Sequence, residues 1–325
     1  YKTFELKCKG HPLSELSKSF GQSALHAVSQ HDISKDEVYD EKKLLKELSQ
    51  TKLDTTKLKE NDHRILGQRL DLFSFNESAP GQPFWHHNGL IIFNELVFFI
   101  RTLLNQFDYQ EVSTPKILDN RLWKVSGHWN HYKNNMFITE HEKRDFGVKP
   151  MNCPGAMLIY KTRPRSYKEL PLKLAEFGEV HRRELSGVLA GLFRVIRITQ
   201  DDAHIFCTKE QISQEIKNLL QLVRIIYKDT FNFDYSFELS TRPEKFMGDK
   251  KDWEYAESVL ENELKKSKVK YKINKGDGAF YGPKVDIHIR DSLGRNWQCA
   301  TIQLDTQIPY RFKLSYTGEA NTELQ

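Results

Sequence analysis

The sequence contains few cysteines, which excludes the small secreted proteins that disulfide bonds hold together. Its four cysteines are scattered over 325 residues, at positions 8, 153, 207 and 299, and this usage suits a reducing compartment. Long apolar runs are also missing. The longest apolar cluster, Gly89 to Leu104, is interrupted by Asn94, Glu95 and Arg101, whereas a membrane span needs about 18 consecutive apolar residues. We therefore expect no transmembrane segment.

Neither a strong charge of one sign nor a glycine-rich phosphate motif identifies a partner. The 49 basic and 44 acidic residues leave a net charge of +5 at pH 7, which permits a polyanionic partner without requiring one. The sequence has no Walker-type P-loop and no Gly-x-Gly-x-x-Gly fingerprint, so any bound phosphate must be held by side chains on strands. The chain begins at Tyr1, without an initiator Met or a signal-like segment, so we expect it to be cut from a longer protein.

The composition is that of a globular protein, with 38% hydrophobic residues and 20 Phe, 13 Tyr and 5 Trp to fill a core. Residues 1–61 differ from the rest and end in a segment rich in Lys and Leu, so we predict an N-terminal appendage with a helical linker. From residue 62 to residue 325, helical and strand patterns alternate without an internal repeat. We expect one α+β domain there, an antiparallel sheet flanked by helices.

Four patterns predict the main elements of this domain. Apolar residues at helical spacing predict a long helix through Phe107, followed by a strand that ends at Pro115. Residues 174–184 and 193–204 read as an antiparallel strand pair joined by a small, flexible loop. Residues 285–289 and 296–304 read as a hairpin. A helix over residues 209–228 is predicted from the capping box Thr208 to Gln211 and one apolar face.

Alternation along the first strand pair gathers charge on one face. Every second residue of a strand points to the same side, so the second strand displays Arg194, Ile198, Gln200, Asp202 and His204 together. The preceding strand adds Arg182 and Glu184. If these faces coincide, the surface is costly to bury without a charged ligand, and guanidinium groups match phosphate oxygens. A solvent-facing strand pair is the simpler alternative.

Two side chains of this region could bind zinc. Cys153 and His204 offer a thiolate and an imidazole, but no Cys-x-x-Cys or His-x-x-x-His accompanies them. By spacing alone, packing is the better interpretation of both. His128 and His131 lie three residues apart without a further ligand nearby, which favours a structural or substrate-channel role.

A resemblance to a known family favours the functional interpretation of these residues. The chain from residue 62 to its end is similar to the class II aminoacyl-tRNA synthetases, and in detail to the threonyl-tRNA synthetase family. The run from Val180 to Ile212 resembles their motif 2, and the helix, strand and Pro115 resemble motif 1, the dimer interface. Other segments resemble the family in order, among them SGHWNHY, KPMNCPGAM, STRPEKFMGD, GDGAFYGPKVDI and QCATIQLDTQIPYRF.

The resemblance implies a role for each candidate residue. Arg182 would hold the ATP α-phosphate and the amino-acid carboxylate, Glu184 would read the adenine amino group, and Arg194 would meet the γ-phosphate. Asp202 would accept the threonine hydroxyl. The resemblance also implies zinc ligation by Cys153 and His204, an adenine contact from Ile198, and further substrate or ATP contacts from Gln200, Tyr281, Lys284, Gln298 and Gln303.

The sequence departs from the family at its end, at Ile198 and at Ala156, which stands where a histidine is common after Cys-Pro-Gly. Ile198 stands where the family has a phenylalanine that stacks on adenine, so we expect weaker ATP binding. The chain stops before motif 3, so the third zinc ligand, a histidine, is expected beyond Gln325 together with the anticodon-binding domain. Residues 1–61 resemble the editing domain only faintly. They are either a remnant of that domain or an unrelated appendage.

The implied function is a threonine–tRNA ligase core that forms threonyl-adenylate from threonine and ATP with Mg²⁺, and passes the threonyl group to tRNA(Thr). The resemblance implies a homodimer, one Zn²⁺, no membrane and a cytoplasmic location, with a mitochondrial one as the other option. The alternative is a non-catalytic synthetase-like module that binds threonine or partners and serves regulation or assembly.

Overall fold

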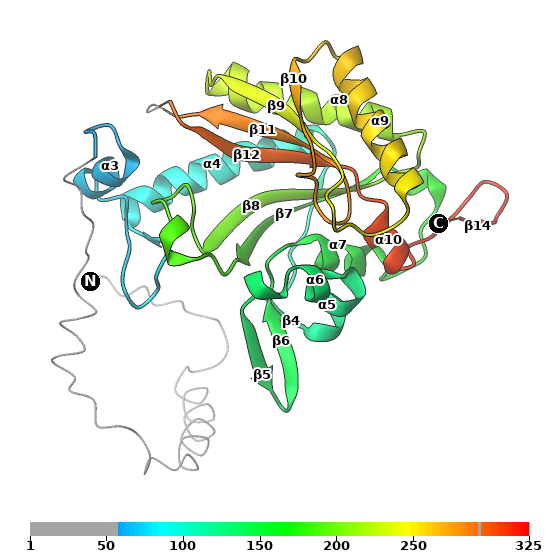
Figure 1. Cartoon of the computed structure of the whole chain (residues 1–325), viewed down its shortest axis with the longest axis horizontal. Coiled ribbons are helices and arrows are strands. Elements are labelled where there is room, and N and C mark those ends of the chain that lie inside the picture. Colours follow the sequence, from blue (N-terminus) through cyan, green and yellow to red (C-terminus); the bar gives the residue numbers. More distant parts are fainter. Residues whose placement is uncertain (1–57, 292–293, 325) are drawn as a thin grey trace, which may run out of the picture. The chain divides into compact units, whose positions relative to one another are not determined.

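The computed structural model of the chain describes residues 58–291 and 294–324. Most of the predicted appendage, including Cys8, lies outside the described residues. Within them, helices accompany sheets whose strands pair mostly antiparallel (Figure 1), so the predicted α+β class is confirmed.

A three-stranded sheet carries the predicted charged strand pair. Its order is β3 (Gln110–Glu111), β7 (Leu172–His181) and β8 (Arg197–Phe206), with β3 parallel to β7 and β7 antiparallel to β8. The antiparallel pair is confirmed, but its bounds differ from the prediction. The ladder ends at the pair His181–Arg197, because the connection of residues 182–196 forms its own 3₁₀ turn, Ser186–Val188.

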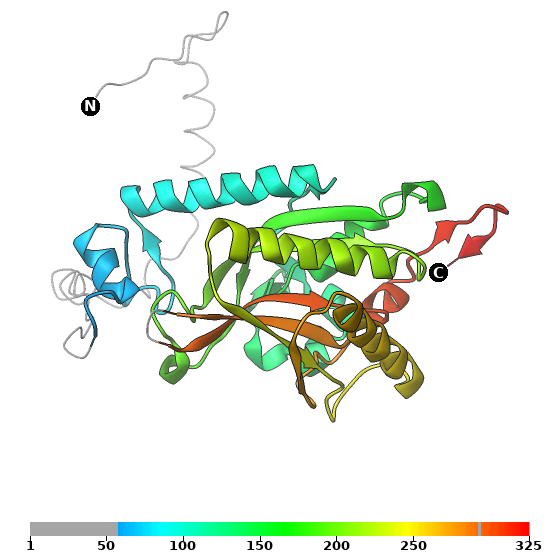
Figure 2. The same cartoon turned by 90° about the horizontal axis from the view of Figure 1, so that it is seen from above.

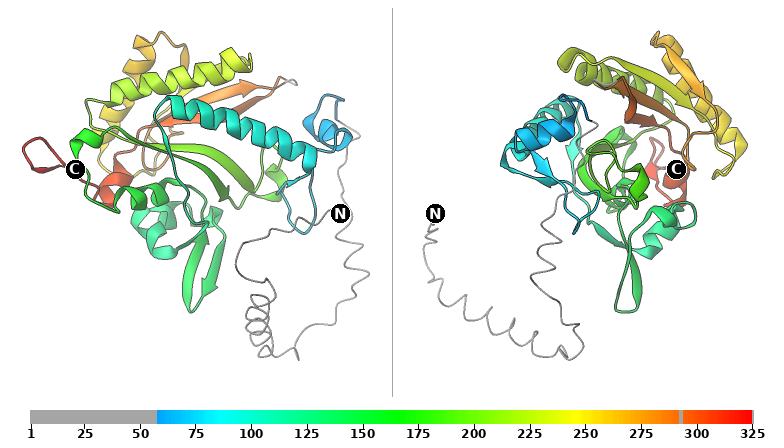
Figure 3. Two further views of the ribbon diagram at one scale, coloured as in Figure 1. Left: turned by 180° about the vertical axis from the view of Figure 1, so that it is seen from behind. Right: turned by 60° about the vertical axis from the view of Figure 1, so that its left-hand side comes forward.

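The predicted long helix is α4 (His87–Gln106), which packs on one face of this sheet. Leu103 of α4, Tyr109, Ala175 of β7 and Leu222 form one buried cluster. Leu222 belongs to α8 (Ile212–Val223), and α4 and α8 run side by side across the strands (Figures 2 and 3). As the helical spacing of its apolar residues predicts, α4 covers one face of the sheet.

The exposed side of α4 is unusually apolar. Among the described helices, α4 alone has the length and composition of a minimal membrane span, with a mean hydropathy of 1.2 in a window that is only 11% buried. Length and composition alone are weak support for a span, because an apolar helix of a soluble protein meets the same test. Five large apolar side chains of α4 are exposed: Leu90, Ile91, Ile92, Leu96 and Phe98.

A second sheet of four strands lies under α8 and α9 (Lys250–Lys266). Its order is β10 (Tyr271–Asn274), β9 (Tyr235–Ser240), β11 (Lys284–Arg290) and β12 (Asn296–Gln303). The predicted hairpin is confirmed as β11 and β12, with a register shift between Ile287 and His288. One face holds the largest core cluster, to which α8 contributes Ile216 and Leu220, and α9 contributes Leu260 and Leu264.

The helix predicted over residues 209–228 is shorter in the structure. The α-helix begins at Ile212 and ends at Val223, and a π-helical segment, Arg224–Thr230, continues it. Only half of the predicted capping box forms, since the Gln211 side chain accepts from the Thr208 amide at 2.9 Å. Residues 208–211 are used in that turn, so the helix starts after them.

The remaining elements are short, and in the described part of the chain their strands pair in three smaller sheets. They are α3 (His63–Arg69), β1 (Phe73–Ser74), β2 (Phe84–Trp85), β4 (Ile117–Asp119), α5 (Asn120–Ser126), α6 (His128–His131), β5 (Ile138–His141), β6 (Arg144–Val148), α7 (Cys153–Tyr160), α10 (Gln307–Arg311), β13 (Tyr316–Thr317) and β14 (Glu323–Leu324).

Candidate active site

The register of β7 and β8 brings the even-numbered residues of both strands to one face, called here the even face. Gly178 pairs with Gln200, Glu176 with Asp202, and Leu174 with His204. Residues opposite each other in an antiparallel pair point to the same side. The even faces therefore coincide within the ladder, whereas Arg182, Glu184 and Arg194 lie beyond its last pair, in the connection between the strands.

The even face is not a solvent-facing surface. Glu176 is 6% exposed and Lys149, which covers it, is 2% exposed. The Lys149 ammonium donates to Glu176 Oε1 at 2.7 Å and to Thr114 Oγ1 at 2.9 Å. A buried ion pair of this kind is stable only when its remaining hydrogen bonds are made, and the Thr114 amide adds one to Glu176 at 2.8 Å.

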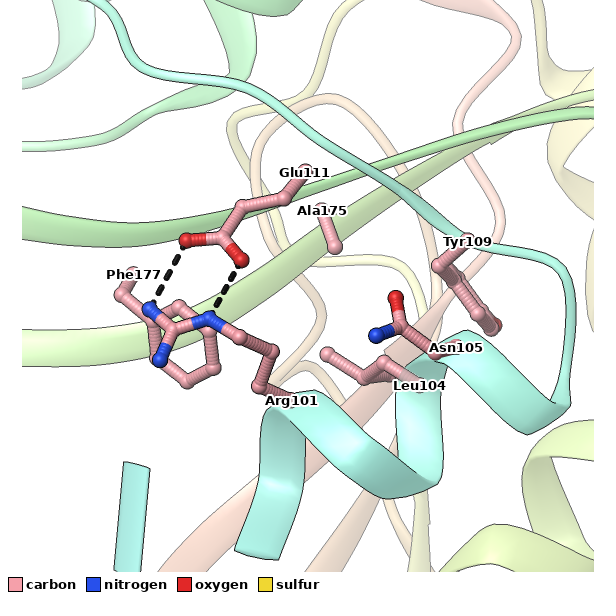
Figure 4. Close-up of a pocket in the computed structure, with 7 residues that line it drawn as sticks. All are labelled: Arg101, Leu104, Asn105, Tyr109, Glu111, Ala175 and Phe177. Carbon is pink, nitrogen blue, oxygen red and sulfur yellow. Dashed lines mark hydrogen bonds and ion pairs between the residues drawn. The ribbon is translucent and has the colours of Figure 1, made fainter. Parts of the chain in front are cut away.

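The opposite face of β7 is occupied by α4. Figure 4 shows a small pocket there, between α4, β3 and the odd-numbered residues Ala175 and Phe177. Arg101 of α4 forms a two-bond ion pair with Glu111, at 2.6 and 2.9 Å, and lies over the Phe177 ring at 4.8 Å. This pocket lies on the other side of the strand from the candidate residues on the even face.

The two predicted arginines have different surroundings. Arg182 follows β7 directly, and its Nε donates to the Pro150 carbonyl at 3.2 Å. Among the described residues it forms no ion pair. Arg194 is 52% exposed and pairs with Glu184 at 3.1 Å. A guanidinium without a carboxylate partner remains free to bind an anion, so Arg182 is the better phosphate candidate in this structure.

Cys153, Asp202 and Tyr281 lie close enough for their charges to interact. Tyr281 is 6% exposed, and its hydroxyl donates to Gln303 Oε1 at 2.9 Å. Burial raises the pKa of Tyr281, and negative charge on Cys153, Asp305 and Asp202 raises it further. The structure thus brings four predicted residues together from α7, β8, β12 and the segment before β11.

Asp305 is a site residue that the sequence analysis missed. Burial raises its pKa to about 7, although its carboxylate accepts from the amides of Gln307 and Ile308 at 2.8 and 3.0 Å. Its position just before α10 is typical of a helix-capping residue. This position predicts that Asp305 caps a helix, but it does not predict that Asp305 lies near the candidate site.

Lys284 and Gln298 contact a buried carboxylate that the sequence analysis also missed. Asp286 is 1% exposed and accepts from Lys284 Nζ at 2.5 Å and from Gln298 Nε2 at 2.6 Å. Ser240 and Thr301 donate to it at 2.7 and 3.1 Å. Lys284 and Gln298, the two predicted substrate contacts, are therefore both held by Asp286 on β11.

The described residues supply only part of a zinc site. Cys153 begins α7 and His204 lies on the even face of β8. No group of three or more His, Cys, Asp or Glu side chains in the described part of the chain could hold a metal ion. Burial, with negative charge on Asp202 and Asp305, raises the pKa of the Cys153 thiol. One thiol and one imidazole do not complete a protein zinc site, which takes at least three ligands.

His128 and His131 both make packing contacts in the structure. His128 is fully buried, with Nδ1 at 2.8 Å from Ser126 Oγ and Nε2 at 3.0 Å from Met151 Sδ. His131 stacks on Phe280 with ring centroids 4.8 Å apart. Ile198, paired with Val180, lies on the even face beyond Gln200.

Comparisons with known proteins agree on one family. Residues 132–325 match the model of the tRNA synthetase class II core domain (G, H, P, S and T). The threonine–tRNA ligases of Clostridium tetani and Thermotoga maritima are each 54% identical to this chain, over 80% and 81% of it. The chain spans 41% of the length of either relative.

Solved structures show the same similarity. The RNA binding domain of threonyl-tRNA synthetase from Cryptosporidium parvum is 47% identical over 80% of this chain and 65% of its own, with a TM-score of 0.78. Prolyl-tRNA synthetase from Giardia lamblia has a TM-score of 0.65 at 17% identity, over 81% of this chain and 48% of its own. At that identity the likeness concerns the fold alone.

Proposed function

Because this chain belongs to the class II tRNA synthetase core family, we propose that it is the catalytic core of a threonyl-tRNA synthetase. The relatives that share 54% of its residues are threonine–tRNA ligases. The observation that supports the proposal most directly is the register of β7 and β8, in which Gln200 and Asp202 share one face and Arg182 follows directly after the last pair of the ladder.

The proposed reaction has two steps. A carboxylate oxygen of threonine attacks the α-phosphorus of ATP, an oxygen–phosphorus bond forms, and the bond to pyrophosphate breaks. The threonyl group then passes from the adenylate to the terminal ribose of tRNA(Thr), and AMP leaves. Phosphoryl chemistry of this kind depends on positioning and charge neutralisation, which suits a face with a free arginine and no evident nucleophile.

The residues divide the substrates between two ends of the even face. Arg182 binds the α-phosphate and the threonine carboxylate, and its bond to the Pro150 carbonyl orients the guanidinium. Glu184 and Arg194, already paired with each other, bind the adenine amino group and the γ-phosphate. Ile198 packs against adenine.

The threonine end lies deeper. Asp202 accepts the threonine hydroxyl, with Gln200, Tyr281 and Gln303 around it. Lys284 and Gln298 add substrate and ATP contacts from a position set by Asp286.

Mg²⁺ accompanies ATP in this proposal, and one Zn²⁺ binds Cys153, His204 and a histidine beyond Gln325. Cys153 and His204 would hold the zinc with that histidine, and the metal would supply a Lewis acid beside Asp202. Metal analysis of the full-length protein tests this assignment. Active protein without zinc would refute it.

A homodimer is part of the proposal, and the exposed face of α4 supports it. Large contiguous apolar surfaces on a soluble protein mark interaction sites. The apolar side chains Leu90, Ile91, Leu96 and Phe98 are between 44% and 64% exposed. A second copy of α4 and the strand after it would cover them. Sedimentation of the full-length protein measures the oligomeric state, and a monomer at micromolar concentration would contradict it.

We further propose that residues 62–325 are the catalytic domain, that residues 1–61 are an appendage, and that the protein is cytoplasmic. Threonine-dependent exchange of pyrophosphate into ATP by the full-length protein tests the activity. We expect threonine to exceed serine, and serine to exceed valine by far, because valine leaves the hydroxyl partners unpaired. Threonine binding without exchange would favour the non-catalytic alternative instead.

A further inference from the structure

Asn152 lies buried against the even face without a role in the function proposed above. It is 1% exposed, and its Nδ2 donates to Asp202 Oδ2 at 3.1 Å. Its Oδ1 is buried and has no hydrogen-bond partner among the described residues. We propose that Asn152 is a positioning residue that makes this site selective for an amino acid with a β-hydroxyl group. The inference rests on the proposed function, in which Asp202 accepts that hydroxyl.

The fold makes room for the Asn152 side chain at one glycine. A Cβ atom on Gly178 would lie 2.3 Å from both Nδ2 and Oδ1 of Asn152, closer than any real contact. The φ angle of Gly178 is not positive, so backbone conformation does not call for glycine there. The missing side chain on β7 is what lets Asn152 lie flat on the sheet and reach Asp202 on β8.

The segment that carries Asn152 is held at its start by the buried ion pair. Lys149 Nζ contacts Glu176 at 2.7 Å, and the Lys149 carbonyl accepts from the His181 amide at 2.9 Å. Lys149 and Glu176 are 2% and 6% exposed. Segment 149–153 is therefore pinned to β7 just before Asn152.

Two further contacts hold the same segment on either side. The Pro150 carbonyl accepts from Arg182 Nε at 3.2 Å, and Met151 Sδ lies 3.0 Å from Nε2 of the buried His128. Cys153 then starts α7. With neighbours fixed on both sides, Asn152 has little freedom to leave Asp202, and this is the preorganisation that selective recognition requires.

The chemistry of the amide suits the task. Carboxylate oxygens only accept hydrogen bonds, so the amide nitrogen must face Asp202. A neutral donor orients the carboxylate without cancelling its charge, and it uses Oδ2, leaving the other oxygen for a ligand hydroxyl.

The test measures pyrophosphate exchange by the full-length protein with threonine, serine and valine. For Asn152→Ala, kcat/KM should fall roughly 10- to 100-fold for threonine and serine, the range for a lost hydrogen bond to a charged group. Most of the loss should be in the KM for the amino acid, with the KM for ATP unchanged. Valine should lose far less, so the preference for threonine over valine shrinks, while the preference over serine is kept.

Two other variants separate positioning from packing. Asn152→Asp keeps the volume but sets a carboxylate against Asp202, so threonine use should fall further than in Asn152→Ala. Gly178→Ala keeps Asn152 but displaces it, and should shift selectivity in the same direction. Combining Gly178→Ala with Asn152→Ala should add little, because both changes remove one contact.

Asn120→Ala is the matched control, since Asn120 Nδ2 donates to Asp145 Oδ2 on the surface at 3.4 Å. It should leave all three amino acids unaffected. Thermal melting and zinc content check each variant. If Asn152→Ala does not fold, the threonine-to-valine ratio measured for Gly178→Ala tests the role of Asn152 instead.

The outcomes distinguish this inference from the function on which it rests. If Asp202→Ala loses threonine activation but Asn152→Ala keeps the threonine-to-valine ratio within about twofold, the role of Asn152 is overturned and the proposed function stands. If Asp202→Ala retains threonine activation, the assignment of Asp202 itself fails. An unchanged ratio in Gly178→Ala would likewise overturn the role of Asn152.

Discussion

The three-stranded sheet β3–β7–β8 and the four-stranded sheet β10–β9–β11–β12 both carry buried charged groups, but the hydrogen-bond partners of those groups differ. On β11 the carboxylate of Asp286 accepts from four donors, so its hydrogen bonds are made within the protein. On the even face of β7 and β8, Glu176 is equally well satisfied by Lys149 and Thr114. A few residues further along that face, Arg182 has no ion pair among the described residues and Asn152 Oδ1 has no partner.

The difference separates structural charges from charges that await a ligand. A buried polar group without a partner costs free energy, so native proteins retain few of them, often where a ligand binds. The satisfied groups around Asp286 and Glu176 shape the site. In the proposed function, Arg182 and Asn152 are the groups nearest to the bound substrate.

The largest effect is expected where a satisfied buried charge loses its partner. Lys149→Met should lower the free energy of unfolding by about 3–5 kcal/mol, because Glu176 is left buried and uncompensated. Urea unfolding followed by tryptophan fluorescence measures this. Adding Glu176→Gln should recover much of the loss.

Lys116→Met is the matched control for this experiment. The Lys116 side chain is 59% exposed and its ion pair with Glu179 lies at the surface, so its removal should cost less than about 1 kcal/mol. Equal losses for Lys116→Met and Lys149→Met would contradict the distinction between the two sites.

The unpaired arginine should matter to activity more than to stability. Arg182→Ala should reduce threonine-dependent pyrophosphate exchange by about 10²–10³-fold, since it removes a charge-stabilising donor of the transition state. Unfolding should change little. Arg183→Ala, at the exposed neighbouring position, should keep exchange near the parent level, and near-normal exchange by Arg182→Ala would refute its assignment.

The pH dependence of the free energy of unfolding should show that the folded protein holds His128 as a neutral imidazole. Burial, together with the charges of His131 and Arg182, lowers the pKa of His128 from 6.5 to about 4. The unfolded chain then binds the proton first, so this contribution to stability is complete above pH 6.5. It is lost as the pH falls toward 4, with a slope of at most about 1.4 kcal/mol per pH unit.

Urea unfolding at several pH values measures that slope. His128→Gln should flatten it, whereas His141→Gln, at a side chain 76% exposed, should not. A slope that His128→Gln leaves unchanged would show that another group is responsible.

The smallest effect concerns the adenine end of the even face. Ile198→Phe should lower the KM for ATP severalfold, because an aromatic contact adds about 0.5–1.5 kcal/mol beyond area burial. An unchanged or higher KM would mean that the pocket is shaped around isoleucine.

Much of the fold was predictable because its signals are local. The spacing of apolar residues predicted α4, and alternation predicted the strand pair and the hairpin. Element ends were less accurate. The predicted helix start at Lys209 was wrong because residues 208–211 form a side-chain-capped turn, a competition that periodicity does not describe.

The candidate site was predictable only in part. Parity required that the even residues of β8 share a face, and the family resemblance supplied roles for them. Asp286, Asp305 and Asn152 were missed, because their proximity to candidate site residues comes largely from segments that are far apart in the sequence. Asn152 is 50 residues from Asp202, and nothing in its own surroundings along the chain indicates that contact.

The sequence by itself determined the family, the helices and strands, and which side chains each strand shows on either face, since these follow from local spacing and from motifs read in order. Only the tertiary structure decided whether the two charged faces would coincide, which charges would be neutralised and which left open. Those outcomes depend on the register of β7 and β8, and on Gly178, whose lack of a side chain leaves room for the buried amide of Asn152. They are properties of long-range packing, in which the free energy of a charged group is set by the partners that the fold brings to it.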